Sequence, residues 1–146
     1  MLNRFCQYNN WANALVLDAL MCNSDLVSES CIRLFSHIVN AQTIWFKRIN
    51  GIVPDVGVWQ INDLETCKIM LEKSADALSE ITQGEPENNA VIKYTTSTGA
   101  HYETLVSDIL LHVFNHGTYH RAQIAKEMKL KNMTPINTDF INFVRI

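Results

Sequence analysis

The 146-residue sequence predicts an all-α protein, a four-helix bundle with a small β-hairpin before the last helix. Apolar residues recur with a period near 3.6 in four long stretches, which are separated by polar breaks or by breaks containing Gly and Pro. Just before the fourth stretch, the β-prone run VIKYTT is followed by Ser97-Thr98-Gly99 and a second short run, a pattern typical of a hairpin. The length suits one domain, residues 1–146, with a core of its own.

The second, third and fourth predicted helices each have a residue that signals their beginning or their end. The four helices are expected to span residues 2–21, 31–49, 64–82 and 105–130. The expected N-terminal caps are Ser28 or Ser30, then Asn62 or Asp63, then Thr104. The second helix should stop at Asn50-Gly51, because glycine adopts a left-handed backbone at low cost, and the third at Gly84 with Pro86 beyond it. The tail from Pro135 carries an apolar patch that should pack on the bundle.

Composition excludes several function classes. The formal net charge is -3, with 12 Lys and Arg against 15 Asp and Glu, whereas binding to nucleic-acid phosphates needs clustered Lys and Arg. We therefore expect no nucleic-acid partner. Arg4, Gln7 and several asparagines interrupt the apolar residues of the first helix, so neither a signal peptide nor a membrane span is predicted. The four cysteines form no CxxC pair and are expected to be reduced and mostly buried in a cytoplasmic protein.

The stretch HVFNHGTYHRAQ, residues 112–123, holds three of the five histidines at a spacing of four. A helix rises about 1.5 Å per residue, so His112 and His120 lie roughly 12 Å apart along its axis. An ion with bonds about 2 Å long cannot easily take both, but two histidines four apart can chelate one ion. His116 therefore belongs to either usable pair, with His112 or with His120, and spacing does not choose between them.

A third ligand has to come from another part of the chain. His37 lies inside an apolar run of the second helix, where a buried imidazole needs a polar partner. His101 lies beside the hairpin turn and is expected to be a solvated loop residue. His37, crossing the bundle to His116 and one neighbour, would make an all-histidine site in the core. The alternative is a set of ordinary histidines satisfied by hydrogen bonds.

Four segments carry a resemblance to a known family: HVFNHGTYHRAQI (112–124), SHIVNAQTIWFKRINGI (36–52), TSTGAHYETL (96–105) and TPINTDFINFVRI (134–146). With these segments, in matching order over nearly the whole chain, the protein resembles the DinB/YfiT-like family of small four-helix metalloproteins. The resemblance implies an up-down-down-up bundle, frequently a homodimer. It also implies a divalent ion, nickel or zinc, held by one histidine of the second helix and two of the last.

On this sequence the family pattern implies His37, His116 and His120 as ligands and makes His112 a neighbour. Ala122 departs from the glycine that relatives often have after the arginine, which leaves the ligands unchanged. Residues near the ligands in the sequence are the candidates to support them from outside: Asn40, His112, Asn115, Tyr119 and Gln123.

Three neutral imidazoles leave the ion its full charge and at least one open position, as in catalytic sites. No side chain stands out as a general base, so the expected nucleophile is a metal-bound thiolate or water. Relatives with assigned activities transfer a low-molecular-weight thiol to an electrophile. The resemblance therefore implies a metal-dependent thiol transferase acting on small molecules. The alternatives are a non-catalytic metal-binding or stress-associated interaction module, or a metal-dependent hydrolase.

Two further features admit more than one interpretation. Trp11, Trp45 and Trp59 are expected to be packing residues, with Trp59 alternatively near a site entrance. Arg121 is expected to form an ion pair or, as the alternative, to face an anionic substrate.

Overall fold

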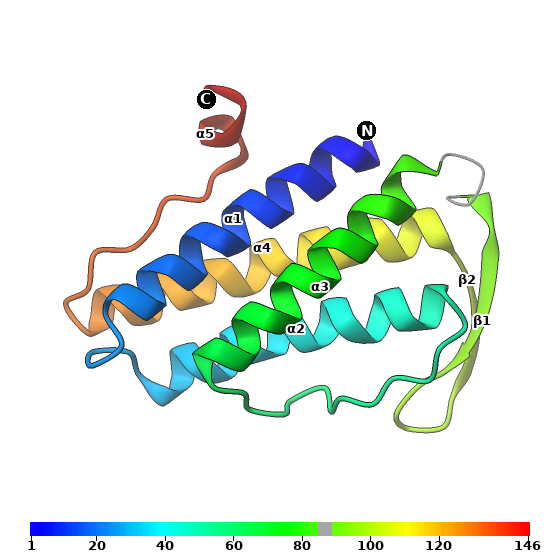
Figure 1. Ribbon diagram of the computed structural model, residues 1–146, viewed down its shortest axis with the longest axis horizontal. Helices are drawn as coiled ribbons and strands as arrows, with labels where there is room; N and C mark the ends of the chain where they lie inside the picture. The colour runs from blue at the N-terminus through cyan, green and yellow to red at the C-terminus, as the bar shows by residue number, and fades with distance from the viewer. Residues whose placement is uncertain (85–88) are drawn as a thin grey trace.

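The computed structural model describes residues 1–84 and 89–146, with four long helices packed side by side and a two-stranded hairpin at one end (Figure 1). The elements are α1 (Leu2–Cys22), α2 (Glu29–Ile49), α3 (Leu64–Gln83), β1 (Val91–Thr95), β2 (His101–Leu105), α4 (Val106–Leu130) and α5 (Phe140–Val144). A mainly helical fold with a hairpin before the last long helix is thus confirmed. Pro86, expected beyond the third helix, lies outside the described residues.

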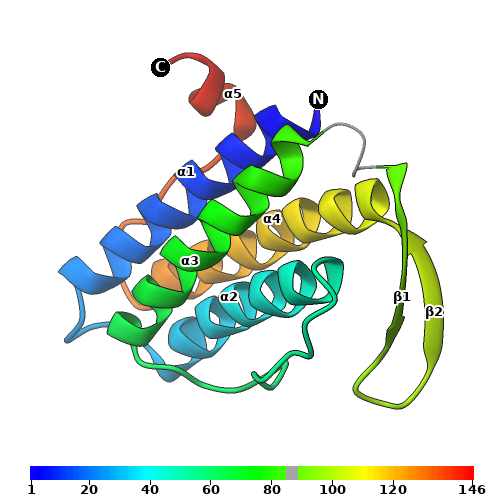
Figure 2. The same ribbon diagram turned by 45° about the vertical axis from the view of Figure 1, so that its right-hand side comes forward.

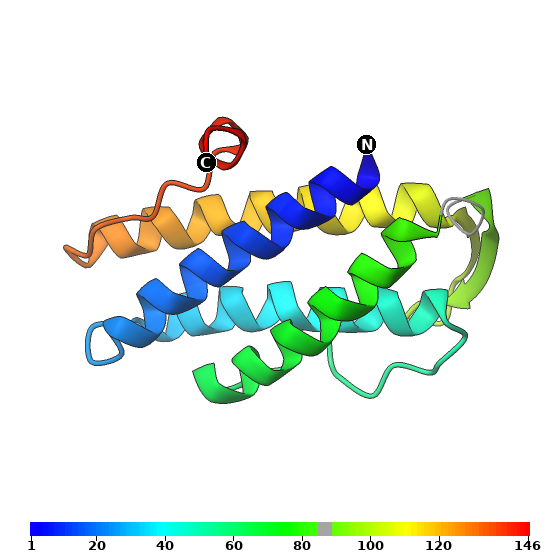
Figure 3. The ribbon, with the colours of Figure 1, turned by 45° about the horizontal axis from the view of Figure 1, so that its top comes forward.

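The helices contact one another as a closed ring. α1 and α2 each pack against both α3 and α4. Residues 50–63 run back along α2, so α3 starts near the end of the bundle where α2 starts (Figure 2). α1 and α4 therefore run in one direction and α2 and α3 in the other (Figure 3). This arrangement places the second predicted helix directly against the fourth.

Local hydrogen bonds explain where the helices begin and end. Ser28 accepts a bond from the backbone N–H of Cys31 at 3.2 Å, and Asp63 accepts one from that of Thr66 at 2.7 Å. Gly51 follows α2 with φ +68°, which confirms the predicted left-handed stop.

The predicted cap of the fourth helix was wrong. Thr104 lies in β2, opposite Ile92, and none of the described side chains caps α4 at Leu105. The reason is that the hairpin ladder runs directly into the helix: the N–H of Val106, the first residue of α4, still donates to the carbonyl of Ala90.

The hairpin is antiparallel, with Val91 opposite Leu105 and Thr95 opposite His101. Gly99 turns the chain with φ +87°, a backbone conformation that favours glycine. His101 is exposed, as expected, but it belongs to β2 and not to a loop, and its Nδ1 lies 2.9 Å from Thr95 Oγ1.

The tail packs on the bundle as predicted, and it also forms the short helix α5, which the pattern did not predict. The Phe140 ring stacks on that of Phe5 at 5.4 Å and meets the Tyr8 ring edge-on at 5.2 Å. All four cysteines are free; Cys22 is exposed and the other three are buried. Among the described residues, no helix combines the length and hydropathy needed to cross a membrane.

A buried cation crosses the core between α1 and α4. Arg121 is only 2% exposed; its Nη1 donates to the side-chain oxygens of Asn9 (3.0 Å) and Asn13 (2.7 Å), and its Nη2 donates to Thr118 Oγ1 (2.9 Å). Both asparagines also donate to Gln42 Oε1 from α2. The expectations of an ion pair or a substrate-facing role for Arg121 were wrong: its partners here are neutral oxygens, and the group is closed off from solvent.

Candidate metal centre

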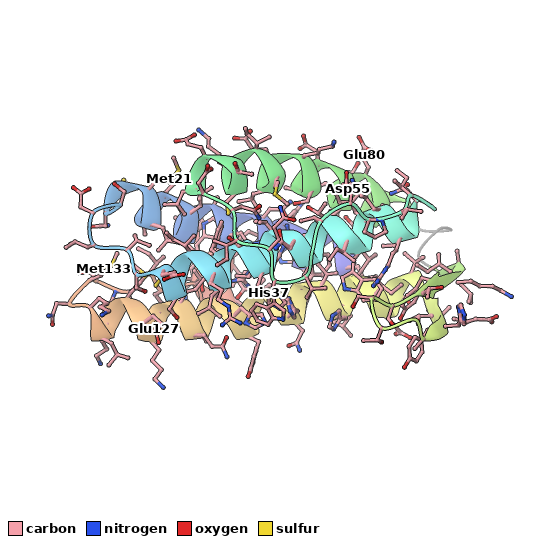
Figure 4. The ribbon with its side chains drawn as sticks, turned by 90° about the horizontal axis from the view of Figure 1, so that it is seen from below. Met21, His37, Asp55, Glu80, Glu127 and Met133 are labelled. Carbon is pink, nitrogen blue, oxygen red and sulfur yellow. The ribbon has the colours of Figure 1, made fainter. Side chains whose placement is uncertain are left out.

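Contact between α2 and α4 brings three histidines together. The Nε2 atom of His116 lies 3.0 Å from His37 Nε2 and 3.1 Å from His120 Nε2. One ligand atom from each ring lies within 4.8 Å of the others, and Figure 4 shows His37 at the boundary between the two helices. Bonds of about 2.0–2.1 Å place two ligand nitrogens of a tetrahedral ion about 3.3–3.4 Å apart. The two pairs that include His116 are slightly closer than this, and no pair is farther apart than 4.8 Å, so a small rearrangement of the rings lets them hold an ion.

Hydrogen-bond acceptors beside two of the rings determine which ring nitrogen carries the proton. His37 Nδ1 lies 2.9 Å from the carbonyl oxygen of Val58, and His120 Nδ1 lies 2.7 Å from Gln123 Oε1. Oxygens of this kind only accept, so each Nδ1 carries the hydrogen and each Nε2 offers a lone pair. His116 Nε2 lies between these lone pairs and has at most one hydrogen to donate. A cation satisfies all three nitrogens, whereas hydrogen bonds satisfy only part of them.

Burial favours the uncharged form of His37 and His116. His37 is only 6% exposed. Loss of hydration lowers the pKa of His37, and it lowers the pKa of His116 to about 3 with the help of repulsion from the neighbouring imidazoles. A neutral imidazole is the form that binds metals, so His37 and His116 need no proton loss near neutral pH.

The free energy of unfolding of the metal-free protein is expected to fall as the pH drops below about 6.5. The pKa of His116 is about 3 in the folded chain, against 6.5 as its ordinary value, so the unfolded chain binds more protons between these limits. This contribution to stability is complete above pH 6.5 and is lost as the pH falls toward 3. Urea denaturation in chelator at pH 7.5 and pH 5 measures it. The loss of unfolding free energy between the two pH values should be smaller in His116→Gln. An equal loss in both proteins would contradict the assignment of this pH dependence to His116.

The loop between α2 and α3 holds His37 from two sides. The Val58 carbonyl oxygen accepts a hydrogen bond from Nδ1 at the ring edge, and the Trp59 indole stacks on the ring face, with centroids 3.7 Å apart and an angle of 5°. Trp59 is 47% exposed, so it lies at the surface beside the three rings, as the alternative interpretation expected. The Arg33 guanidinium covers the indole, with Cζ 4.6 Å from its centroid. Nothing in the sequence pattern predicted Val58, because it acts through its backbone.

Asn40 is the anchor of this loop. Its Nδ2 donates to the carbonyl oxygen of Gln60 at 2.7 Å, and its Oδ1 accepts from Asn62 Nδ2 at 2.9 Å. Asn40 thus supports His37 indirectly, by fastening to α2 the loop that contacts the ring.

The other predicted neighbours differ in their distance from the cluster. Gln123 makes a hydrogen bond to His120 Nδ1, and Tyr119 meets the His120 ring edge-on with centroids 5.1 Å apart. The His112 ring lies 5.5 Å from that of His116 and contacts Trp45. Asn115 is exposed and, within the described part of the chain, makes no hydrogen bond to the three rings.

The chain is similar to one protein family over almost its whole length. The family model of the DinB family matches residues 2–146, a range that contains α2, α4 and all three histidines. No curated protein matches the chain. Because the match extends over the whole described bundle, the chain belongs to the DinB family.

Proposed function

We propose that the protein binds a divalent ion, nickel or zinc, through His37, His116 and His120, and that it transfers a low-molecular-weight thiol to a small electrophile. One observation supports metal binding best. Three Nε2 atoms converge, and they have too few hydrogens to form hydrogen bonds that satisfy all three nitrogens. Membership of the DinB family supports the same conclusion. The family also supports an up-down-down-up bundle, with which the helix directions agree.

The donor set favours chemistry at the ion. Three neutral nitrogens leave an ion its positive charge and an open position, and a bound ion of this kind supplies Lewis acidity that favours the thiolate form of a thiol. The chain supplies the positioning: Val58 and Gln123 fix the two Nδ1 protons, and Trp59 covers one face of His37. Among the described residues, no carboxylate makes a hydrogen bond to the three rings, which argues against a side-chain general base there.

The test is a conjugation assay on untagged protein of measured metal content. We expect about one ion per chain and, with a thiol and chlorodinitrobenzene, conjugation faster than the uncatalysed reaction. Both should be lost in His116→Ala and in His120→Ala. His101→Ala, which removes an exposed histidine of β2, is the matched control and should retain both.

Two results would contradict parts of this proposal. Bound metal without conjugation across several thiols would exclude the transferase and favour the non-catalytic module. Absence of metal from protein purified without a tag, and after addition of zinc or nickel, would exclude the metal centre as well.

A further inference from the structure

We propose that a groove between α1, α4 and the start of α5 is a second binding site, which takes a small organic cation: an amine on an apolar body. The groove has a volume of about 700 Å³, within the range of pockets that bind small molecules. Neither His116 nor His120 is among the residues that line it. The inference does not rest on the proposed metal centre or on thiol transfer.

Aromatic and aliphatic side chains form a preassembled apolar wall in this groove. Phe5 and Phe140 stack at 5.4 Å, and Tyr8 meets Phe140 edge-on at 5.2 Å. The Tyr8 hydroxyl donates to the carbonyl oxygen of Thr138 at 2.8 Å, which fastens the segment entering α5. Leu111 extends the wall and is 50% exposed. Because these groups are already ordered, a ligand's apolar body can be covered with little loss of side-chain freedom.

Two carboxylates set the charge of the groove. Asp108 and Asp139 both line it, and neither forms an ion pair within the described part of the chain. None of the described residues that line the groove is a lysine or an arginine. Arg121 lies behind the Tyr8 ring, with Cζ 5.3 Å from its centroid, and is buried among neutral partners. A largely apolar groove whose lining includes two carboxylates is complementary to an ammonium group on an apolar body.

Residues that the metal centre does not use also line this groove. His112, the first histidine of the spaced motif, and Asn115 are both part of its lining, together with Thr118. They add neutral polar groups that can accept further hydrogens of an ammonium. The groove therefore gives a role to His112 and Asn115, neither of which makes a hydrogen bond to the three rings among the described residues.

The experiment compares three probes of one shape on the metal-free full-length chain: 3-phenylpropylamine, 3-phenylpropan-1-ol and 3-phenylpropanoate. Amide shifts in NMR spectra give the location and the affinity. The amine should shift amides in residues 5–8, 108–118 and 138–140. The alcohol should bind about fivefold more weakly, and the carboxylate should not bind.

Substitutions test separately how much the two carboxylates and the apolar wall contribute to amine binding. The double variant Asp108→Asn with Asp139→Asn should weaken amine binding about tenfold, since each exposed ion pair contributes up to about 1 kcal/mol. Asp76→Asn, the same change at an exposed position of α3, is the matched control and should have no effect. Leu111→Lys should abolish amine binding with an unchanged melting temperature, because the side chain is exposed in the free protein.

Three results would overturn the inference. One is equal affinity for the amine and the alcohol, and another is unchanged amine affinity in the double variant. The third is concentration-dependent shifts of the same amides without any probe, which would identify a second copy of the chain as the occupant. Since the protein is metal-free throughout, none of these results depends on whether the histidines bind an ion.

Discussion

His116→Ala is expected to lower the affinity for zinc by about a hundredfold to a thousandfold. Apparent binding energies of about 10–16 kcal/mol for four-ligand zinc sites correspond to roughly 2.5–4 kcal/mol for each ligand. His116 is the central member of the cluster, because its Nε2 lies within 3.1 Å of those of both His37 and His120. Competition with a chromogenic chelator measures the affinity, and zinc should no longer raise the melting temperature of the variant.

His112→Ala is the matched control, since it removes the same side chain from the same helix one turn earlier. Its ring lies 5.5 Å from that of His116 and outside the cluster, so the affinity should fall by less than about tenfold. The comparison also decides between the two pairs that the spacing of the motif left open. If zinc affinity falls as much in His112→Ala as in His116→Ala, the ion is held by His112 and His116, and the assignment to His116 and His120 is contradicted.

Gly117→Ala is expected to lower the free energy of unfolding by about 2–4 kcal/mol, although alanine is the better helix former by about 1 kcal/mol. An added Cβ would lie 2.7 Å from Asn9 Oδ1 and 2.8 Å from Arg121 Nη1, closer than real contacts allow. Either group must then move, and the bond of 3.0 Å between them is lost inside the core. A buried guanidinium left short of a partner is among the costliest single defects.

Urea denaturation measures this loss, and Ala122→Gly in the same helix is its control. Ala122 is exposed, so the reverse exchange there reports helix propensity alone and should cost about 1 kcal/mol. If the free energy of unfolding of Gly117→Ala equals or exceeds that of the natural protein, the contact between α1 and α4 can accommodate a methyl group and the prediction is wrong.

The helix and hairpin positions could be predicted because short-range chemistry determines them. Ser28, Asp63, Gly51 and Gly99 each act within a few residues of their own place in the chain. The predicted Thr104 cap was wrong because a contact with a more distant part of the chain determines the conformation at this position. Its backbone is committed to a strand partner twelve residues earlier, and a pairing partner competes with a cap in a way that the local pattern does not reveal.

The candidate site was predictable only in part. Helical spacing limited the ligands on α4 to two pairs, and the family pattern selected one of them, but the loop that holds His37 could not be predicted. Val58 acts through its carbonyl, which every residue has, and Trp59 reaches the ring across 22 positions of sequence. The two asparagine partners of Arg121 lie 108 and 112 residues away, so no local pattern pointed to them.

The neutral partners of Arg121 make the contact between α1 and α4 insensitive to acid. A carboxylate in the place of Asn9 or Asn13 would gain a proton in acid and release the guanidinium, whereas an amide has no proton to gain. The histidine cluster between α2 and α4 has the opposite property. As the pH falls, we expect the contact between α2 and α4, which contains His37, to open first, while the contact between α1 and α4, which contains Arg121, stays intact.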